Sequence, residues 1–234
     1  TWGDGGTSEV DLVPGRRDFE LRHRYLDDAP TAIGRPNYEI GMLATGEHGA
    51  EARLTRSVTV ANVAPTIDAL TVTSTVDENG VVTLKGSVGD VGGLDTHTLT
   101  VDWGDGTVET FDRTPADRGF ERTHRYLNDA PTAIGAAAYT VTVTAADRRG
   151  ATATATRGVD VRNVAPTLED VVVTSTLDEN GIAHLTGRVA DVGTLDGHTL
   201  TVTWGDGSTD TVKIDSKSRD FALDHRYLDD APTA

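Results

Sequence analysis

The sequence has no cysteine among its 234 residues, so no disulfide bond can hold its domains together. Basic residues are scarce, because 21 Lys and Arg stand against 37 Asp and Glu and give a formal net charge of −16. Nucleic acid is therefore not expected as a partner, since phosphate needs a basic surface. An acidic surface attracts cations instead. No apolar run reaches the length of a membrane span, and no signal peptide is visible.

The usual signatures of catalysis are missing as well. The sequence has no Gly-x-Ser-x-Gly nucleophile elbow, no P-loop and no dinucleotide-binding fingerprint, and its serines do not recur beside histidines. No stretch shows the apolar period of an amphipathic helix. We therefore expect a protein that is built of β-strands and is not an enzyme.

What is present is a long internal repeat. The residues Trp-Gly-Asp-Gly occur at Trp2–Gly5, Trp103–Gly106 and Trp204–Gly207, a constant spacing of 101 residues. Such a unit is long enough for an independent β-sandwich and exceeds the roughly 20–50 residues of solenoid repeats. We expect the C-terminal part of one module in residues 1–61, a complete module in 62–162 and the N-terminal part of a third in 163–234. Because the sequence starts and stops within a unit, we expect a segment of a longer protein.

The complete unit alternates apolar and polar residues in short runs. Leu99, Val101 and Trp103 fall on one face of such a run, which is the pattern of a half-buried strand. Asp105-Gly106 then suits a tight hairpin turn. The expected strands are 67–75, 81–88, 98–103, 108–113, 120–126, 139–145 and 151–161. Their number and spacing predict an all-β fold of tandem immunoglobulin-like sandwiches with antiparallel strands.

Turns and links follow the same period. Asn79-Gly80 favours a hairpin, Gly158 suggests a bulge in the last strand, and a strand of the first unit is expected to end at His23–Tyr25. The sequence Asn-Val-Ala-Pro-Thr joins the units at 62–66 and again at 163–167. Proline keeps the preceding alanine extended, so this link is stiffer than a Gly/Ser tether.

The ordered set of motifs resembles the PKD (polycystic kidney disease) repeat family, bacterial type. The resemblance covers essentially the whole chain. It rests on Asn-x-x-Pro at 62–65, an Asp-containing loop before the Trp strand, Trp-Gly-Asp-Gly, His-Arg-Tyr at 124–126, Tyr-Thr-Val-Thr-Val at 139–143 and Asp-x-x-Gly at 147–150. It implies PKD-type sandwiches of about seven strands in an extracellular or bacterial cell-surface setting. It also implies spacing, adhesion and contact with proteins or carbohydrates.

The resemblance further implies a calcium site at one end of each module, because some PKD modules bind calcium there. The candidate ligands are Asn62, Asp90, Asp95 and Asp147 in the complete unit and Asn163, Asp191 and Asp196 in the next. Of these, Asp95 is added from its place on the loop of Asp90. Calcium takes six to eight oxygen ligands, and these positions gather at one pole of an immunoglobulin-like fold. The alternative is that the side chains only cap loops as Asx-turns.

Two further recurring groups have competing interpretations. Acidic pairs followed by Ala-Pro-Thr stand at Asp27-Asp28, Asn128-Asp129 and Asp229-Asp230. Each binds a further cation or forms a solvated acidic cap, and the cap is favoured. The histidines at 23, 124 and 225, and those at 97 and 198, have no neighbouring His or Cys. This favours hydrogen-bonded imidazoles over metal ligands.

The aromatic residues favour a structural interpretation too. Trp103 and Tyr139 lie on the expected buried face of alternating strands, which favours core positions over a sugar-stacking platform. We therefore expect a repeat segment of a stalk, adhesin shaft or filament, stiffened by calcium, whose partners are its neighbouring modules. The alternatives are a polysaccharide- or protein-binding accessory module of a secreted hydrolase, and self-association. The regular period argues for the shaft.

Overall fold

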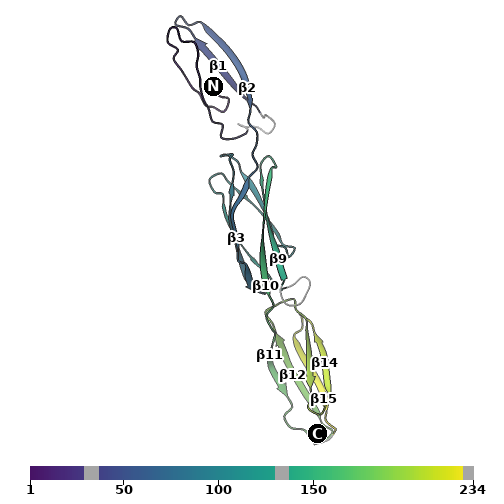
Figure 1. Ribbon diagram of the computed structural model, residues 1–234. Coiled ribbons are helices and arrows are strands. Elements are labelled where there is room, and N and C mark those ends of the chain that lie inside the picture. Colours follow the sequence, from purple (N-terminus) through teal and green to yellow (C-terminus); the bar gives the residue numbers. More distant parts are fainter. Residues whose placement is uncertain (29–36, 130–136, 229–234) are drawn as a thin grey trace.

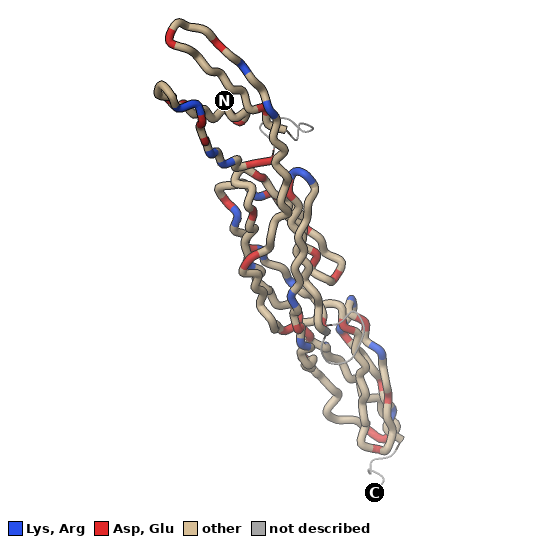
Figure 2. The backbone as a smooth tube through the Cα atoms, turned by 45° about the horizontal axis from the view of Figure 1, so that its top comes forward, with Lys and Arg blue, Asp and Glu red and all other residues tan. Residues whose placement is uncertain are grey.

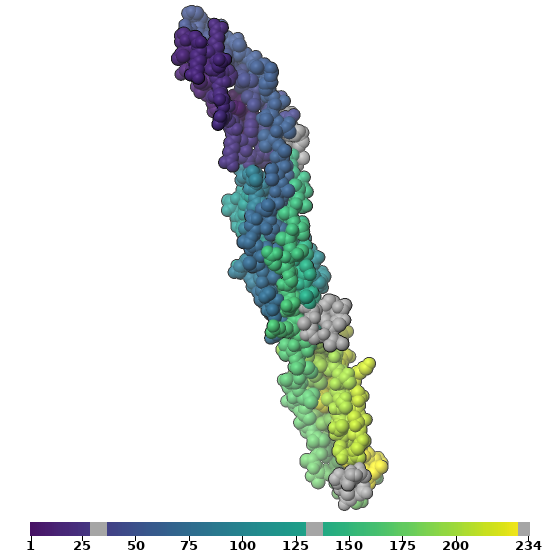
Figure 3. All heavy atoms as spheres, viewed as in Figure 1, coloured from purple at the N-terminus to yellow at the C-terminus, as the bar shows by residue number. Residues whose placement is uncertain are grey.

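The computed structural model describes residues 1–28, 37–129 and 137–228. Every regular element in this part of the chain is a β-strand, which confirms the all-β fold class. The strands form three groups that follow one another end to end in an elongated molecule (Figure 1). The space-filling view shows the same order along its length (Figure 3). We call the groups the first, middle and third modules; their exact boundaries at 61/62 and 162/163 stay a prediction.

The middle module is a sandwich of two sheets. Its strands are β3 (Thr66–Val72), β4 (Thr75–Asp77), β5 (Val81–Gly89), β6 (His97–Asp102), β7 (Val108–Arg113), β8 (Gly119–Arg125), β9 (Ala137–Asp147) and β10 (Thr152–Arg162). One sheet has the order β3-β5-β8 and the other β4-β10-β9-β6-β7. The pairings are antiparallel, except that β4 runs parallel to β10.

The core lies between these sheets because alternate residues of each strand face inward. Leu84 of β5, Leu99 of β6 and Val141 of β9 are completely buried. Trp103, directly after β6, is 1% exposed, and Tyr139 of β9 is 7% exposed. Both aromatic residues are therefore core residues, as expected. Removing this apolar surface from water is the main stabilising term of the module.

The described residues of the outer modules contain fewer strands. The third module pairs β11 (Thr167–Val173), β12 (Ile182–Ala190) and β15 (Asp220–Arg226) in one sheet, and β13 (His198–Thr203) with β14 (Thr209–Ile214) in another. The first module has the hairpin of β1 (Asn37–Thr45) and β2 (Glu51–Thr59). The strand expected to end at His23–Tyr25 is wrong, because residues 1–28 contain no strand. In the middle module the equivalent strand, β8, pairs with β5.

Three local expectations for the complete unit are also wrong. A bulge between Asp68 and Thr71, with Ala69 at φ 50°, interrupts β3, which pairs with β5 as far as Val72 before the chain continues in the other sheet as β4. Asn79-Gly80 therefore turns the chain between sheets and closes no hairpin. The register of β9 and β10 runs through Gly158 without a bulge. The irregularity lies in β3 instead, between Asp68 and Thr71.

Trp-Gly-Asp-Gly closes the β6–β7 hairpin as expected. Gly104 and Gly106 have φ values of 83° and 95°, which glycine adopts without strain. A Cβ on Gly104 would lie 2.7 Å from the backbone oxygen of Thr140 in β9, whereas nothing lies within 4 Å of one on Gly106. The turn therefore requires both glycines, and close packing of the hairpin on β9 also requires the first.

Alanine substitutions separate these two constraints. Gly106→Ala should reduce the unfolding free energy by about 1 kcal/mol because of its positive φ. Gly104→Ala should reduce it by about 2–4 kcal/mol, because the β9 backbone must also move. Urea denaturation followed by circular dichroism measures both losses. Equal losses would contradict the packing role of Gly104.

Candidate functional site: acidic joints between modules

Each module holds a histidine against its tryptophan. In the middle module the His124 ring stacks on Trp103 with ring centroids 4.8 Å apart, and its Nε2 lies 2.6 Å from Asp105 Oδ2. The Tyr126 hydroxyl donates to the Trp103 carbonyl at 2.7 Å, and burial raises the pKa of Tyr126, which keeps it a donor. Equivalent stacks occur in the other two modules. The expected hydrogen-bonded imidazole is confirmed at residues 23, 124 and 225.

Two of the predicted calcium ligands clasp each other at one end of the middle module. Asn62 donates from Nδ2 to Asp147 Oδ2 at 2.7 Å. The other oxygen of Asp147 accepts the backbone N–H groups of Arg149 and Ala151. Burial opposes ionisation, but these hydrogen bonds outweigh it and lower the pKa of Asp147. The arrangement ties the link between modules to the turn after β9.

The predicted ligand Asp90 is paired with a histidine. Its Oδ2 lies 2.8 Å from His97 Nε2, and both side chains are fully shielded from solvent. Its Oδ1 accepts the Gly92 N–H at 2.7 Å, as in an Asx-turn. Asp191 and His198 repeat the pair at 2.7 Å. The hydrogen-bonded imidazole expected at residues 97 and 198 is thus confirmed, and each aspartate orders its own loop.

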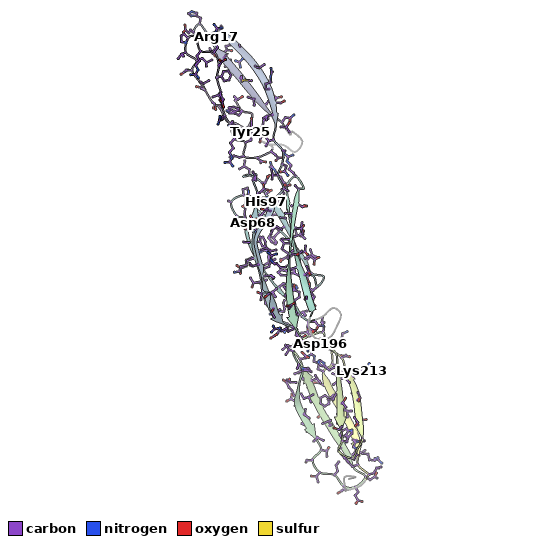
Figure 4. The ribbon with its side chains drawn as sticks, viewed as in Figure 1. Arg17, Tyr25, Asp68, His97, Asp196 and Lys213 are labelled. Carbon is purple, nitrogen blue, oxygen red and sulfur yellow. The ribbon has the colours of Figure 1, made fainter. Side chains whose placement is uncertain are left out.

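Consecutive modules meet through the same backbone hydrogen bond. The Gly93 N–H donates to the Leu26 carbonyl at 2.8 Å, and the Thr194 N–H donates to the Leu127 carbonyl at 3.3 Å. We call the two contact regions the first and second joints. The first joins residues 26–28 to the loops at 90–97 and 147–150; the second joins residues 78 and 127–129 to the link and loop at 163–166 and 191–198. Figure 4 places His97 near the first joint and Asp196 at the second.

Asp95 of the middle module belongs to the first joint. Ligand-type oxygens of Asp95, Asp27 and Asp28 all lie within 4.8 Å of one another. Asp27 is only 7% exposed, so the expectation of a solvated acidic cap is wrong here. Residues 26–28 of the first module contact Gly93, Arg148 and Arg149 of the middle module, and these contacts shield Asp27 from water.

Two arginines of the turn after β9 neutralise part of the first joint. Arg148 Nη2 lies 2.9 Å from Asp27 Oδ2, and its Nε lies 3.4 Å from Asp95 Oδ1. Arg149 Nε lies 3.0 Å from Asp28 Oδ2. Burial and the neighbouring aspartates nevertheless raise the pKa of Asp28 and of Asp95. Three carboxylates thus face two guanidinium groups in a partly buried region, where salt screens charges weakly.

The second joint contains a glutamate that the sequence did not single out. Glu78, in the turn after β4, joins Asp191 and Asp196 in a group whose ligand-type oxygens lie within 4.8 Å of one another. Its Oε1 accepts the Val164 N–H at 2.7 Å. The middle module therefore holds the link to the third module through this side chain, which also lies beside the acidic loop.

An open hollow of about 460 Å³ lies at the second joint. Its lining consists of Asp129, Asn163, Pro166, Asp191, Asp196, Gly197 and His198. The three ligands predicted for the third module therefore lie around one space, with Asp129 of the middle module beside them. Asp129 is 7% exposed, so it is not a solvated cap either. The third acidic pair, Asp229 and Asp230, lies outside the described residues. Acidic segments of the backbone lie where consecutive modules meet (Figure 2).

Glu78 is the buried glutamate of the second joint. It is 3% exposed, and its Oε2 has no hydrogen-bond partner. Burial raises the pKa of Glu78, the hydrogen bond from Val164 opposes this, and the charges of Asp196 and Asp191 raise it further. Within residues 1–28, 37–129 and 137–228, no Lys or Arg forms an ion pair with these three acids.

The sequence pattern held a signal for this arrangement. In the middle module Glu78 follows β4 and Asn128-Asp129 follow β8, two strands that run away from the Asn62 end. In a tandem array the far end of one module must meet the near end of the next. The acidic turns at the far end of one module therefore lie beside the acidic loop at the near end of the next. This could have been inferred from the period and the short link.

These charges predict an unusual response to acid in the presence of a chelator. The pKa values of Glu78 and Asp95 are raised above 4.5 and 3.8, so the folded state binds these protons more tightly than the unfolded state. Stability should therefore rise as the pH falls from 7 toward about 5. The lowered pKa of Asp147 contributes stability that is lost below its ordinary value of 3.8. Calorimetry from pH 7 to 3 should show a maximum in melting temperature.

Glu78→Gln should flatten the rising part of this profile, because it removes the group that gains a proton. Glu179→Gln is the matched control, since Glu179 occupies the same turn one period on and is exposed. A wild-type melting temperature that falls steadily from pH 7 would contradict the assignment.

The motifs behind the PKD resemblance now lie in one connected structure. The Trp-Gly-Asp-Gly hairpin carries the His124 stack, the Tyr139 strand β9 pairs with β6 of that hairpin, and Asn62 donates to Asp147. The modules are PKD-like, immunoglobulin-type sandwiches. No protein-family model and no curated protein matches the chain.

Several solved structures are similar to this PKD-like chain. The PKD domain of an M14-like peptidase from Thermoplasmatales archaeon SCGC AB-540-F20 is 19% identical, over 44% of this chain and 99% of that one, with a TM-score of 0.35. A tetra-tandem repeat in the extending region of a large adhesion protein is 20% identical, over 82% of this chain and 48% of that one, with a TM-score of 0.46. The chain thus spans about half of that adhesion-protein structure.

A third similar structure is the rat CD45 extracellular region, domains d3–d4. It is 11% identical, over 66% of this chain and 76% of that one, with a TM-score of 0.31. All three scores lie below 0.5. The fold assignment therefore rests on the strand pairing of this chain and on the hydrophobic core between the two sheets of its middle module.

Proposed function

We propose that this chain is a non-catalytic structural spacer, a run of PKD-like modules in a stalk, adhesin shaft or filament. The observation that carries the proposal is the pair of joints, in which side chains and backbone of one module bind the next. At the first joint these contacts are Gly93 to Leu26, Arg148 to Asp27 and Arg149 to Asp28. Such contacts restrict bending, and the modules follow one another in an elongated array (Figure 1).

A spacer requires joints that resist bending without a large interface. A hydrogen bond contributes only about 0.5–1.5 kcal/mol, or more when one partner is charged. Several bonds that act on both a loop and the link hold the orientation better than one. At the second joint the Glu78 carboxylate accepts the Val164 N–H of the link, and the Leu127 carbonyl accepts the Thr194 N–H of the acidic loop. This two-point attachment favours a fixed angle between modules.

Calcium is the proposed stiffening ion. Carboxylate and amide oxygens are the ligands it prefers, and Asn163, Asp191 and Asp196 supply them around one hollow. In the middle module Asn62, Asp90 and Asp147 already have protein partners, which agrees with the Asx-turn alternative. Asp191 repeats the contacts of Asp90, with the Gly193 N–H and with His198.

The proposed setting is a secreted or bacterial cell-surface protein. Extracellular modules bind calcium at about 10⁻⁴–10⁻³ M, so weak sites at the joints suit that setting. Among the described residues, no helix is long and apolar enough to cross a membrane. The proposed partners are the neighbouring modules. A sugar-binding accessory module is less favoured, because Trp103 and Tyr139 are buried in the core.

Small-angle X-ray scattering tests the spacer and its calcium dependence separately. With calcium the chain should scatter as an extended array with a narrow spread of shapes. With a chelator the same chain should show a broader spread and a lower melting temperature, because unscreened carboxylates repel each other at the joints. A compact particle in both conditions would contradict the spacer. An identical profile and melting temperature in both conditions would reject calcium stiffening alone.

A further inference from the structure

The β1–β2 hairpin of the first module and the β9–β10 hairpin of the middle module have the same backbone turn. In the first module the Gly46 N–H donates to the Ala50 carbonyl and the Gly49 N–H to the Gly46 carbonyl, both at 2.8 Å. In the middle module Asp147 and Gly150 donate the two equivalent bonds at 3.0 Å. The turn glycines have similar φ values of 80° and 86°. The residues between them therefore hold equivalent positions, at the end of each module that faces away from the C-terminus (Figure 1).

The side chains on this turn differ between the two modules. The middle module has Arg148 and Arg149 where the first module has Glu47 and His48, both of which are exposed. A cation is thus replaced by an anion at one position and by a group without a permanent charge at the other. The backbone is the same, so the difference lies in what the turn can bind.

The turn of the first module also lacks the carboxylate that holds a link. In the middle module Asp147 accepts the side chain of Asn62 in the link at 2.7 Å. Gly46 occupies the equivalent position in the first module, and glycine has no side chain that could accept such a bond. The clasp and the arginines, which both fix the first joint, are therefore missing together from this turn.

In the middle module the two arginines bind the acidic far end of the first module, which consists of Asp27 and Asp28. Arg148 Nη2 lies 2.9 Å from Asp27 Oδ2, and Arg149 Nε lies 3.0 Å from Asp28 Oδ2. The two aspartate side chains are only 6% and 11% exposed, so salt screens these pairs weakly. A like charge opposite a shielded carboxylate is strongly unfavourable, and charged interfaces exclude wrong partners in this way. The same far end could therefore not dock against a glutamate.

We propose that the turn after β9 selects by charge the module that precedes it. Arg148 and Arg149 accept a far end with an acidic pair, such as Asp27-Asp28. The Glu47-His48 turn of the first module rejects such a far end and fits one that carries a basic residue instead. The proposal rests on the fixed joints of the spacer proposed above and adds a rule for which modules can be neighbours.

Pulsed electron paramagnetic resonance on the whole chain tests this rule through the spread of distances across the first joint. The chain has no cysteine, so spin labels attach only where cysteines are introduced. Ser57→Cys in β2 and Thr123→Cys in β8 place one label on each side of the joint at exposed positions. The labelled parent chain should give a single narrow distance peak.

The decisive variant carries the side chains of the first-module turn in the middle module. Arg148→Glu/Arg149→His presents them to the acidic far end but leaves Asp147 and its clasp in place. The narrow peak should be lost, because a carboxylate then faces a carboxylate in a partly buried contact. Lys85→Glu is the matched control. It reverses a charge in an exposed ion pair with Glu121 on the surface of the middle module and should keep the narrow peak.

Compensating changes distinguish recognition by charge from general disruption. Arg149→Asp and Asp28→Arg should each lose the narrow peak alone. The two together should restore it, because the ion pair is rebuilt with its charges exchanged. Asp27→Arg should likewise restore the peak in Arg148→Glu/Arg149→His, because it supplies the basic far end that this turn fits.

The outcomes separate this proposal from the spacer itself. A narrow peak retained by Arg148→Glu/Arg149→His would overturn selection by charge. Loss of the peak that the compensating changes do not restore would overturn it as well, and would leave the arginines a packing role only. In both cases a narrow peak in the parent chain would leave the spacer intact. A broad distribution in the parent chain would reject the fixed joints, and with them both proposals.

Discussion

Repulsion between carboxylates is the constraint on which the arrangement of modules depends. The acidic loops would stay apart in water, but the short proline link brings the far end of one module to the near end of the next. At the first joint the guanidinium groups of Arg148 and Arg149 offset the repulsion. At the second joint Glu78 lies buried among acids, and Arg219 donates to the backbone carbonyls of Asp191 and Gly193. Both joints therefore bring like charges close together.

The sandwich provides the rigid frame for these joints. Trp103 fixes the β6–β7 hairpin to β8 through His124 and Tyr126, and Gly104 lets that hairpin pack directly on β9. At the opposite end of β9, Asp147 is tied to Asn62 of the link. A contact at the link is thus connected through one strand to the core. This connection explains how a few polar bonds can orient a whole module.

Much of the middle module was predictable because its strands are regular. Strict alternation along β6 and β9 identified buried residues such as Leu99 and Val141, and Asp105-Gly106 identified the hairpin between β6 and β7. The prediction was wrong where the pattern is ambiguous. Residues 67–75 read as one strand, but β3 ends at Val72 and the chain joins the other sheet as β4 at Thr75. Sequence cannot locate such a crossing, because it depends on which strand edges lie free in three dimensions.

For the candidate ligands, the difference between what the sequence determined and what the tertiary structure decided is larger. The 101-residue period alone established tandem modules, their acidic ends and the residue types available to a cation. It did not establish which acids meet. Only the tertiary structure paired Asn62 with Asp147 and Asp90 with His97, and placed Glu78 beside Asp196 of the following module. The physical reason is that periodicity reports the environment of a residue within its own strand or turn. A site between modules depends instead on how two separately folded surfaces meet.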